Sequence, residues 1–268
     1  MPVDLDVLIP TFSRPSALAV TLAGLAAQDW RHFRVIVSSQ DEDEIAPHHP
    51  EVRTMVGVLR EHGHDVDVQQ HLPRRGLAEH RQSLLDQVTA PYALFLDDDV
   101  YLEPPTIGRL MDAIRRMRCG FVGSAPIGLT YAHDERPHEQ ELELWEAEVT
   151  PERVEPGGLG WQRHRLHNAA NILHAARNLG LGPAEYRLYR VAWVGGCVLY
   201  DTQALREAGG FGFWSELPPV HAGEDVLAQL RVMARRGGAG LIPSGAYHLE
   251  LPTTVPDRTH DAPALLGV

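Results

Sequence analysis

The sequence feature that most constrains the fold is an apolar run that ends in three consecutive aspartates. Residues 93–96 read Ala-Leu-Phe-Leu, and Asp97, Asp98 and Asp99 follow directly. Such a run is typical of a short strand that is buried on both faces of a sheet. Adjacent carboxylates repel one another, and a divalent cation with oxygen ligands is the simplest partner for them. The alternative is a solvated turn that caps the helix starting near Pro104.

The stretches on either side alternate between strand-like and helix-like patterns. Strands are predicted at residues 7–10, 33–38, 65–69, 92–96, 120–123, 191–200 and 240–248, and helices at 17–28, 52–62, 76–88, 106–118, 166–179, 202–208 and 224–236. This alternation predicts an α/β fold, a Rossmann-like and mostly parallel sheet with helices on both faces. No element is predicted for residues 126–165, which are either a mobile segment over a site or a solvated acidic insertion, or for the tail from residue 252.

Composition narrows the function classes. The 268 residues carry a net charge of -12, which argues against broad nucleic-acid binding. All 24 basic residues are arginine, so neither Schiff-base nor P-loop lysine chemistry is available. Cys119 and Cys197 are far apart and are expected to be free thiols in a reducing compartment. With no visible signal peptide or membrane span, we expect a cytoplasmic protein; peripheral attachment to the inner membrane face is an open alternative.

Several separated motifs, in this order, resemble the family 2 glycosyltransferases, which are inverting enzymes of the GT-A fold. They are the opening strand and loop at residues 7–15, the second strand ending at Asp41, residues 76–82 around Arg81, the Asp-x-Asp motif at 97–99, Gly-Gly-Phe at 209–211, Gly-Glu-Asp at 223–225, and Tyr-His at 247–248. The resemblance spans about residues 5 to 250. It implies one GT-A domain over residues 1–268, with a nucleotide-sugar-binding half at about 1–100 and an acceptor-binding and catalytic half at about 101–268.

The resemblance also implies a donor site for a nucleoside-diphosphate sugar, most commonly a uridine diphosphate sugar. Asp41 is expected to accept a hydrogen bond from the base. The loop at Pro10, Thr11, Phe12 and Arg14 is expected to line the same pocket, Arg81 to contact base or phosphate, Asp97 to bind the ribose, and Asp98 to lie beside them. From spacing alone, Arg81 could equally be a surface residue paired with Glu79 or Asp86.

By the same resemblance, Asp99 would hold a Mn²⁺ or Mg²⁺ ion, with His248 as a further ligand. The metal would act as a Lewis acid on the leaving diphosphate. For His248 the alternative is a structural or exposed histidine. The close pairs His48-His49 and His62-x-His64 are interpreted as surface residues rather than a second metal site.

Asp225 is the expected general base for the acceptor hydroxyl, with Glu224 as the second choice. A carboxylate near other negative charges has a raised pKa, which suits proton abstraction. The alternative role for both is to stabilise the first turn of the helix through its dipole. Trp161, Trp193 and Trp214 could stack on sugar rings, although core packing is the simpler role for Trp193. The acceptor, a glycan, a lipid-linked sugar or a small molecule, is left open.

Other enzyme classes fit the motifs less well. A dinucleotide-binding enzyme needs a glycine-rich fingerprint after the first strand, and residues 11–15 contain no glycine. A nucleotidyltransferase-like enzyme on a similar fold would also carry a glycine-rich loop there. A non-catalytic nucleotide-sugar-binding relative stays an alternative, although the presence of both Asp99 and Asp225 favours a working enzyme.

Overall fold

The computed structural model describes residues 3–42 and 48–267. Its strands are β1 (Leu5–Thr11), β2 (Phe33–Ser39), β3 (Val66–Gln70), β4 (Tyr92–Leu96), β5 (Val100–Leu102), β6 (Phe121–Gly123), β7 (Arg187–Tyr189), β8 (Cys197–Asp201), β9 (Gly238–Ile242) and β10 (Ala246–His248). Its α-helices are α1 (Pro15–Ala26), α2 (Pro50–Glu61), α3 (Leu77–Leu85), α4 (Thr106–Met117), α5 (Asn171–Leu179), α6 (Thr202–Glu207), α7 (Glu224–Arg236) and α8 (Ala262–Leu266). Short 3₁₀ helices punctuate the remaining loops.

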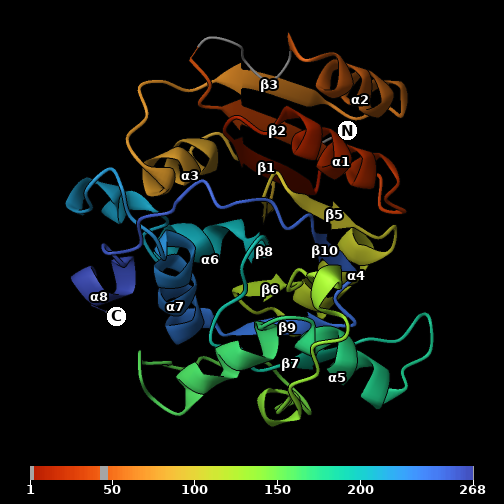
Figure 1. Ribbon diagram of the computed structural model, residues 1–268, viewed down its shortest axis with the longest axis vertical. Helices are drawn as coiled ribbons and strands as arrows, with labels where there is room; N and C mark the ends of the chain where they lie inside the picture. The colour runs from red at the N-terminus through yellow and green to blue at the C-terminus, as the bar shows by residue number, and fades with distance from the viewer. Residues whose placement is uncertain (1–2, 43–47, 268) are drawn as a thin grey trace.

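One large sheet runs through the molecule in the order β3-β2-β1-β4-β8-β6-β9-β7 (Figure 1). The strands β3, β2, β1 and β4 are parallel, whereas β8 is antiparallel to both β4 and β6, and β7 is antiparallel to β9. A second, two-stranded sheet pairs β10 with β5. The predicted α/β class, with a mostly parallel sheet and flanking helices, is confirmed.

Two hydrophobic cores form, one on each face of the sheet. Side chains alternate along β1, so that Leu5, Val7 and Ile9 join one core and Leu8 joins the other. The first core is completed by apolar residues of α1, α2 and α4, and the second by those of α3, α5, α6 and α7. Burial on both faces explains why β4 has no polar residue before its aspartates.

Two predicted strands were wrong in extent. Residues 191–196 are irregular, and β8 begins only at Cys197. The predicted strand 240–248 is two strands in different sheets, β9 and β10, because Pro243 offers no backbone N–H and Gly245 has a positive φ of 68°. The chain therefore turns there and carries His248 to the smaller sheet.

Other differences lie in the second half of the chain. The predicted helix 166–179 begins at Asn171 and follows a 3₁₀ helix, Gly160–His167. The tail ends in α8, which the sequence did not reveal and whose first turn is capped by Asp261. Both cysteines are free, as predicted, and both are buried. Across the described parts of the chain, no helix has the length and apolarity needed to cross a membrane.

Candidate active site

The three aspartates lie at the carboxyl end of β4, beside the ends of β1 and β2. Because these three strands are parallel, their carboxyl ends meet at one edge of the sheet. Asp98 is buried there, and its carboxylate accepts a hydrogen bond of 2.7 Å from the Thr11 hydroxyl. Burial raises the pKa of Asp98 to about 6, against the opposing effect of the Thr11 bond. Asp98 thus joins the ends of β4 and β1.

Asp99 faces two cationic or ionisable side chains. Its Oδ2 lies 2.6 Å from Nη1 of Arg14 and 3.5 Å from Nε2 of His248. Burial raises the pKa of Asp99, although His248 and Arg14 counteract this. Nη2 of Arg14 donates to the carbonyl of Pro252, so the loop after β1 also contacts the C-terminal segment. Arg14 therefore places its charge beside the aspartates, and its expected place in a donor pocket stays a prediction.

Arg81 joins the aspartate run to helix α7. Its Nη2 donates to Asp97 over 3.0 Å, and its Nε donates to Glu224 over 3.1 Å. Arg81 and Glu224 are buried, whereas the side chain of Asp97 is 37% exposed. Burial opposes the charge on Arg81, but the two carboxylates raise its pKa above the ordinary value. The alternative pairing of Arg81 with Glu79 or Asp86 is wrong.

Helix α7 presents Asp225 beside this ion pair. The helix begins after Gly223, which has a φ of 76° and would place a Cβ within 2.7 Å of the Asp261 carboxylate. Asp225 is half-buried, and its carboxylate accepts a hydrogen bond from the N–H of Val226. Burial and the nearby Glu224 raise the pKa of Asp225 to about 7, against the effect of Arg81. Asp225 can therefore exchange a proton near neutral pH.

Asp41 organises the loop after β1 from the end of β2. One of its oxygens accepts from the N–H and hydroxyl of Ser13, at 2.7 and 3.0 Å, and the other accepts from the Ser39 hydroxyl at 2.7 Å. This second oxygen keeps room for another donor. The guanidinium of Arg74 lies 3.6 Å from the ring centroid of Phe12, which the sequence did not foretell. Pro10 is buried within β1.

The structure thus brings nearly all of the predicted site residues to one edge of the sheet. Arg14, Arg81, Asp97, Asp98, Asp99, Glu224 and His248 are linked by the contacts above, with Asp225 next to Glu224, and Asp41 and Phe12 lie on the adjoining loops. The paired histidines are not part of this group. His64, interpreted as a surface residue, is in fact buried and stacks on Phe33 at a centroid distance of 4.0 Å.

Two carboxylate oxygens of the aspartate run are available to a cation. Within the described residues no group of three or more His, Cys, Asp or Glu side chains is placed to hold a metal alone. Oδ1 of Asp99 and Oδ2 of Asp97 make no hydrogen bond to the described residues and are not sealed from solvent. Hard carboxylate oxygens of this kind suit Mg²⁺ or Mn²⁺.

The hydrogen bonds of His248 bear on its expected role as a metal ligand. Its Nδ1 accepts from the N–H of Glu250 over 2.8 Å, so in the neutral ring Nε2 carries the proton and faces Asp99. Metal binding through Nε2 would require that proton to leave. The role of His248 as a ligand stays a prediction.

The sequence did not predict that the segment between Val191 and β8 contacts the aspartates and helix α7. The carbonyl of Gly196 accepts from the N–H of Asp97 at 2.8 Å. Gln229 of α7 bonds both the N–H and the carbonyl of Val194, each at 2.8 Å. The glycine pair in this segment was the only available signal, since a side chain at Gly196 would approach Pro126 within 2.9 Å.

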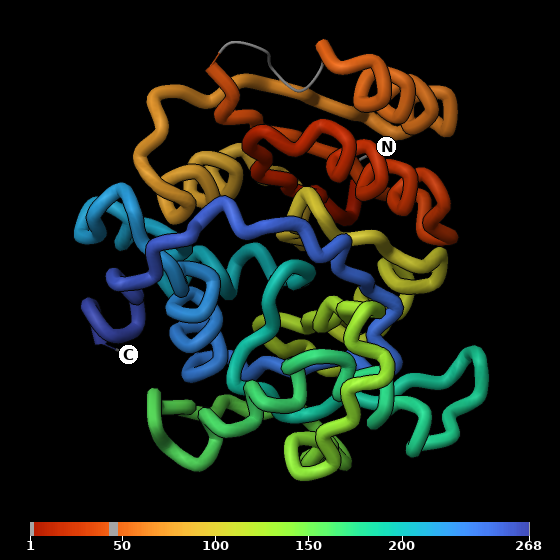
Figure 2. The backbone as a smooth tube through the Cα atoms, viewed as in Figure 1, coloured from red at the N-terminus to blue at the C-terminus, as the bar shows by residue number. Residues whose placement is uncertain are grey.

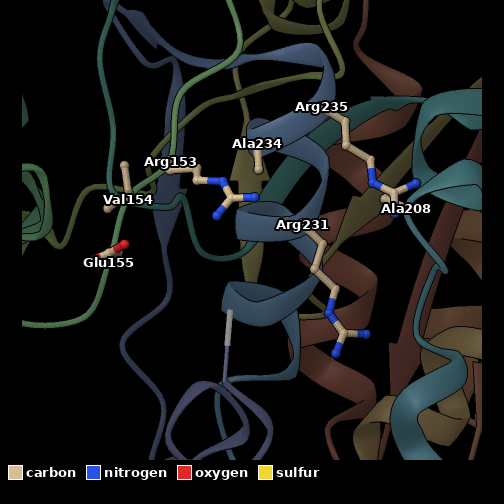
Figure 3. Close-up of a pocket in the computed structure, with 7 residues that line it drawn as sticks. All are labelled: Arg153, Val154, Glu155, Ala208, Arg231, Ala234 and Arg235. Atoms are coloured by element: carbon tan, nitrogen blue, oxygen red, sulfur yellow. The ribbon is translucent and has the colours of Figure 1, made fainter.

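A cavity of about 260 Å³ lies away from the aspartates, beside the second half of α7. Its lining, drawn in Figure 3, is Arg153, Val154, Glu155, Ala208, Arg231, Ala234 and Arg235. Arg231 lies 5.0 Å from the ring centroid of Phe213, and Arg235 donates to the carbonyl of Glu207. Arg235 thus lies in the last turn of α7 and bonds the carbonyl end of α6, and Arg231 packs on an aromatic ring, so we assign no ligand to this cavity.

A family model, glycosyl transferase family 2, matches residues 6–158, which is more than half of the chain. The chain belongs to glycosyltransferase family 2. The predicted family is thereby confirmed. No curated protein sequence matches the chain.

Solved structures of glycosyltransferases share this family member's fold. TarS 1–349 from S. aureus is 17% identical with a TM-score of 0.58, over 92% of this chain and 60% of that one. The same TarS fragment in complex with UDP-GlcNAc is 16% identical, with a TM-score of 0.57 over 94% and 60%. The mannosyltransferase PcManGT from Pyrobaculum calidifontis, in complex with GDP-Man and Mn²⁺, is 14% identical, with a TM-score of 0.54 over 90% and 57%. The chain thus spans less than two thirds of these relatives.

Proposed function

We propose that this chain transfers a sugar from a nucleoside-diphosphate sugar to an acceptor hydroxyl in a single, inverting displacement that depends on a divalent metal. One observation carries the proposal. Arg81 binds Asp97 and Glu224 together, and this leaves Asp225, with its raised pKa, next to the aspartates as the carboxylate that is able to accept a proton. Donor complexes of the fold neighbours, with UDP-GlcNAc or GDP-Man, support a nucleotide-sugar donor.

The donor is proposed to lie along the loops after β1 and β2. Asp41 has a free acceptor position for a base N–H, and the ring of Phe12 with its neighbouring Arg74 offers a flat surface beside it. Backbone groups of Pro10 and Thr11 extend the same edge, and Asp97, with one free carboxylate oxygen, is proposed to bind the ribose. A uridine diphosphate carrier is our first choice.

The diphosphate is proposed to lie beside the Arg14–Asp99 pair. A metal held by Asp99, with His248 as the candidate second ligand, would polarise the diphosphate and stabilise the negative charge that develops on the leaving group. The guanidinium of Arg14 adds a fixed positive charge at the same place. Asp98 is bound to Thr11 and Arg14, so its role is to hold this loop in position.

The acceptor hydroxyl is proposed to lie beside Asp225 and to approach the anomeric carbon from the face opposite the leaving group. Asp225 takes the hydroxyl proton as the oxygen attacks the anomeric carbon, and one displacement inverts that carbon. Glu224 is less suited to this step because it is buried and committed to Arg81. Arg81 is then the residue that keeps α7 and the aspartates at a fixed separation, in addition to its proposed proximity to the donor.

Calorimetry with a panel of nucleoside diphosphates, each with Mn²⁺ and with a chelator, tests the donor site. We expect one nucleotide to bind only when metal is present. A second arm measures sugar transfer, because a non-catalytic relative would bind the nucleotide without turnover. Binding of no nucleotide by the folded protein would refute the proposal. The cytoplasmic location, a peripheral membrane attachment, the two-half division and the kind of acceptor stay predictions.

A further inference from the structure

Three aromatic side chains gather where the sequence offered only separate tryptophans. Trp161 and His164 lie three residues apart on the 3₁₀ helix Gly160–His167, which is one turn, so both project from the same side. Both pack against Trp193. The Trp161 and Trp193 centroids are 4.5 Å apart, and the His164 ring is stacked on Trp193 at 5.2 Å and 10°. We call Trp161, His164 and Trp193 the aromatic platform.

The platform is tied to the proposed reaction centre through the backbone that carries Trp193. The next residue, Val194, is bonded on both backbone groups by Gln229, which lies four residues after Asp225 on α7. Four residues of α-helix correspond to about 6 Å of rise. Three residues after Trp193, the carbonyl of Gly196 accepts from the N–H of Asp97. The segment therefore has one end beside the aspartates and is clamped one helical turn from the proposed base.

The polar atoms of the platform are open rather than satisfied within the protein. Nδ1 of His164 donates to the carbonyl of Trp161 at 2.7 Å, so the neutral ring presents a lone pair on Nε2. Within the described residues, neither Nε2 of His164 nor the indole N–H of Trp161 or Trp193 has a partner, and none of the three is sealed from solvent. By contrast, the indole nitrogens of Trp30 and Trp145 are buried.

We propose that the aromatic platform binds a sugar ring of the acceptor, which makes the acceptor a glycan or glycoside. A pyranose has an apolar face of C–H groups, which suits the electron-rich face of an indole, and a rim of hydroxyls that both donate and accept hydrogen bonds. The two indole N–H donors and the one imidazole acceptor that have no partner among the described residues can bond the hydroxyls of such a rim. This inference rests on the proposed function, since it names the substrate of the same site.

Simple core packing would account for the stacking but not for the open polar atoms. A tryptophan that serves only to pack the core is expected to have its N–H inside the protein. An indole whose ring is packed while its N–H is open to solvent is typical of a binding surface. All three platform residues are half-buried, and Trp161 and Trp193 pack at the surface of the second core. A packing role predicts a loss of stability on substitution, whereas a binding role predicts a loss of saccharide affinity at unchanged fold.

The test uses tryptophan fluorescence with a panel of methyl glycosides of glucose, galactose, mannose and N-acetylglucosamine, titrated into the full chain with the bound nucleoside diphosphate and Mn²⁺. We expect at least one glycoside to give a saturable change. Trp193→Ala should weaken that binding roughly tenfold or more, while Trp193→Phe should restore most of it. Trp161→Ala provides a second variant if Trp193→Ala does not fold, as judged by its melting temperature.

Trp214→Ala is the matched control, because Trp214 is also half-buried but makes no aromatic contact with the platform in the described structure. It should keep the glycoside affinity of the parent chain. A saturable fluorescence change that persists in both Trp193→Ala and Trp161→Ala would overturn the proposal that the platform binds a sugar. The absence of binding by every glycoside would overturn it as well.

Failure of the platform and failure of the proposed function are distinguishable. If a nucleotide binds with metal but no glycoside binds, the platform inference fails and the donor site stands. If glycosides bind through Trp193 but no nucleotide binds, the platform stands as a saccharide site and the transferase proposal fails. With an active acceptor, Trp193→Ala should raise KM for the acceptor more than it lowers kcat.

Discussion

The guanidinium of Arg81 lies between two carboxylates that are 127 residues apart in the chain, with Nη2 on Asp97 and Nε on Glu224. Arg81 and Glu224 are both almost completely buried. A buried ion pair stabilises a fold less than its Coulomb energy suggests, but removal of one member leaves an uncompensated charge. This contact therefore fixes where helix α7 begins relative to the aspartates and decides which of its two acidic residues stays free.

The first prediction concerns this ion pair. Arg81→Leu should lower the free energy of unfolding by about 3–5 kcal/mol, because Glu224 would be left buried and charged. Urea denaturation measures the change. Arg236→Ala is the control, since its contact with Glu207 is exposed on both sides and is expected to contribute at most about 1 kcal/mol. Equal losses in the two variants would show that burial of the Arg81 pair has no energetic consequence.

The second prediction separates the two candidate bases. Asp225→Asn should keep nucleotide binding and lower kcat by a factor on the order of 10²–10⁴, the usual contribution of a positioned base. Glu224→Gln should instead act on stability through Arg81, with a smaller loss of kcat in the protein that remains folded. Transfer rates and calorimetric nucleotide affinities are measured for both variants. Retained transfer by Asp225→Asn would move the base elsewhere.

The third prediction is a pH dependence of stability. The pKa of Asp225 is raised to about 7 in the folded state, so between its ordinary value and pH 7 the folded protein binds more protons than the unfolded chain. The contribution of Asp225 to stability must then fall as the pH rises from about 4 to 7. Asp225→Asn should consequently raise the melting temperature at pH 8, and change it little at pH 4.5. A stabilisation that does not depend on pH would contradict the raised pKa.

The fourth prediction concerns the metal. Asp99→Ala should abolish the metal-dependent part of nucleotide binding, which calorimetry with Mn²⁺ and with chelator measures directly. Asp65→Ala, at an exposed carboxylate outside the site, should keep the metal dependence of the parent chain. Unchanged affinity of the Asp99 variant in Mn²⁺ would remove this assignment. His248→Ala measures separately whether the imidazole contributes.

The fifth prediction tests the link between β1 and β4. Thr11→Val removes the 2.7 Å hydrogen bond to the buried Asp98 while keeping the shape of the side chain. The expected loss is about 1.5–3 kcal/mol, the usual range for a hydrogen bond to a charged group. Thr130→Val is the matched control, because the Thr130 hydroxyl also bonds a carboxylate, that of Glu250, but at the exposed surface. A similar loss in both variants would argue against a special role for Asp98.

Much of this fold was predictable because many of its elements follow local rules. Strand β4 ended at Leu96 as predicted, and α7 matched at both ends, since acidic residues begin it and Gly237 ends it. The errors lie where tertiary contacts decide. Residues 191–196 look like a strand in composition, yet their backbone bonds go to Gln229 and Asp97 rather than to a neighbouring strand.

The site was predictable in its residue types but not in its pairings. Spacing alone favoured Glu79 and Asp86 as partners of Arg81, because they are close to it in sequence. Its actual partners, Asp97 and Glu224, lie 16 and 143 residues away. The contact of Arg74 with Phe12 and the joining of Trp161 to Trp193 depend on loops that carry no periodicity. Such contacts are fixed only when the loops are folded against the sheet.

The path of the C-terminal segment has a consequence for the order in which this protein can mature on the ribosome. Figure 2 shows that segment, in blue, crossing the middle of the molecule. The N–H of Leu249 bonds the carbonyl of Asp99, and Arg14 reaches the carbonyl of Pro252. During synthesis β1 to β4 leave the ribosome well before residues 249–252 do, so these strands can form while the contacts that hold the aspartates are still missing. Donor binding should therefore emerge only once the chain has been made beyond Pro252 and this segment has packed across the molecule.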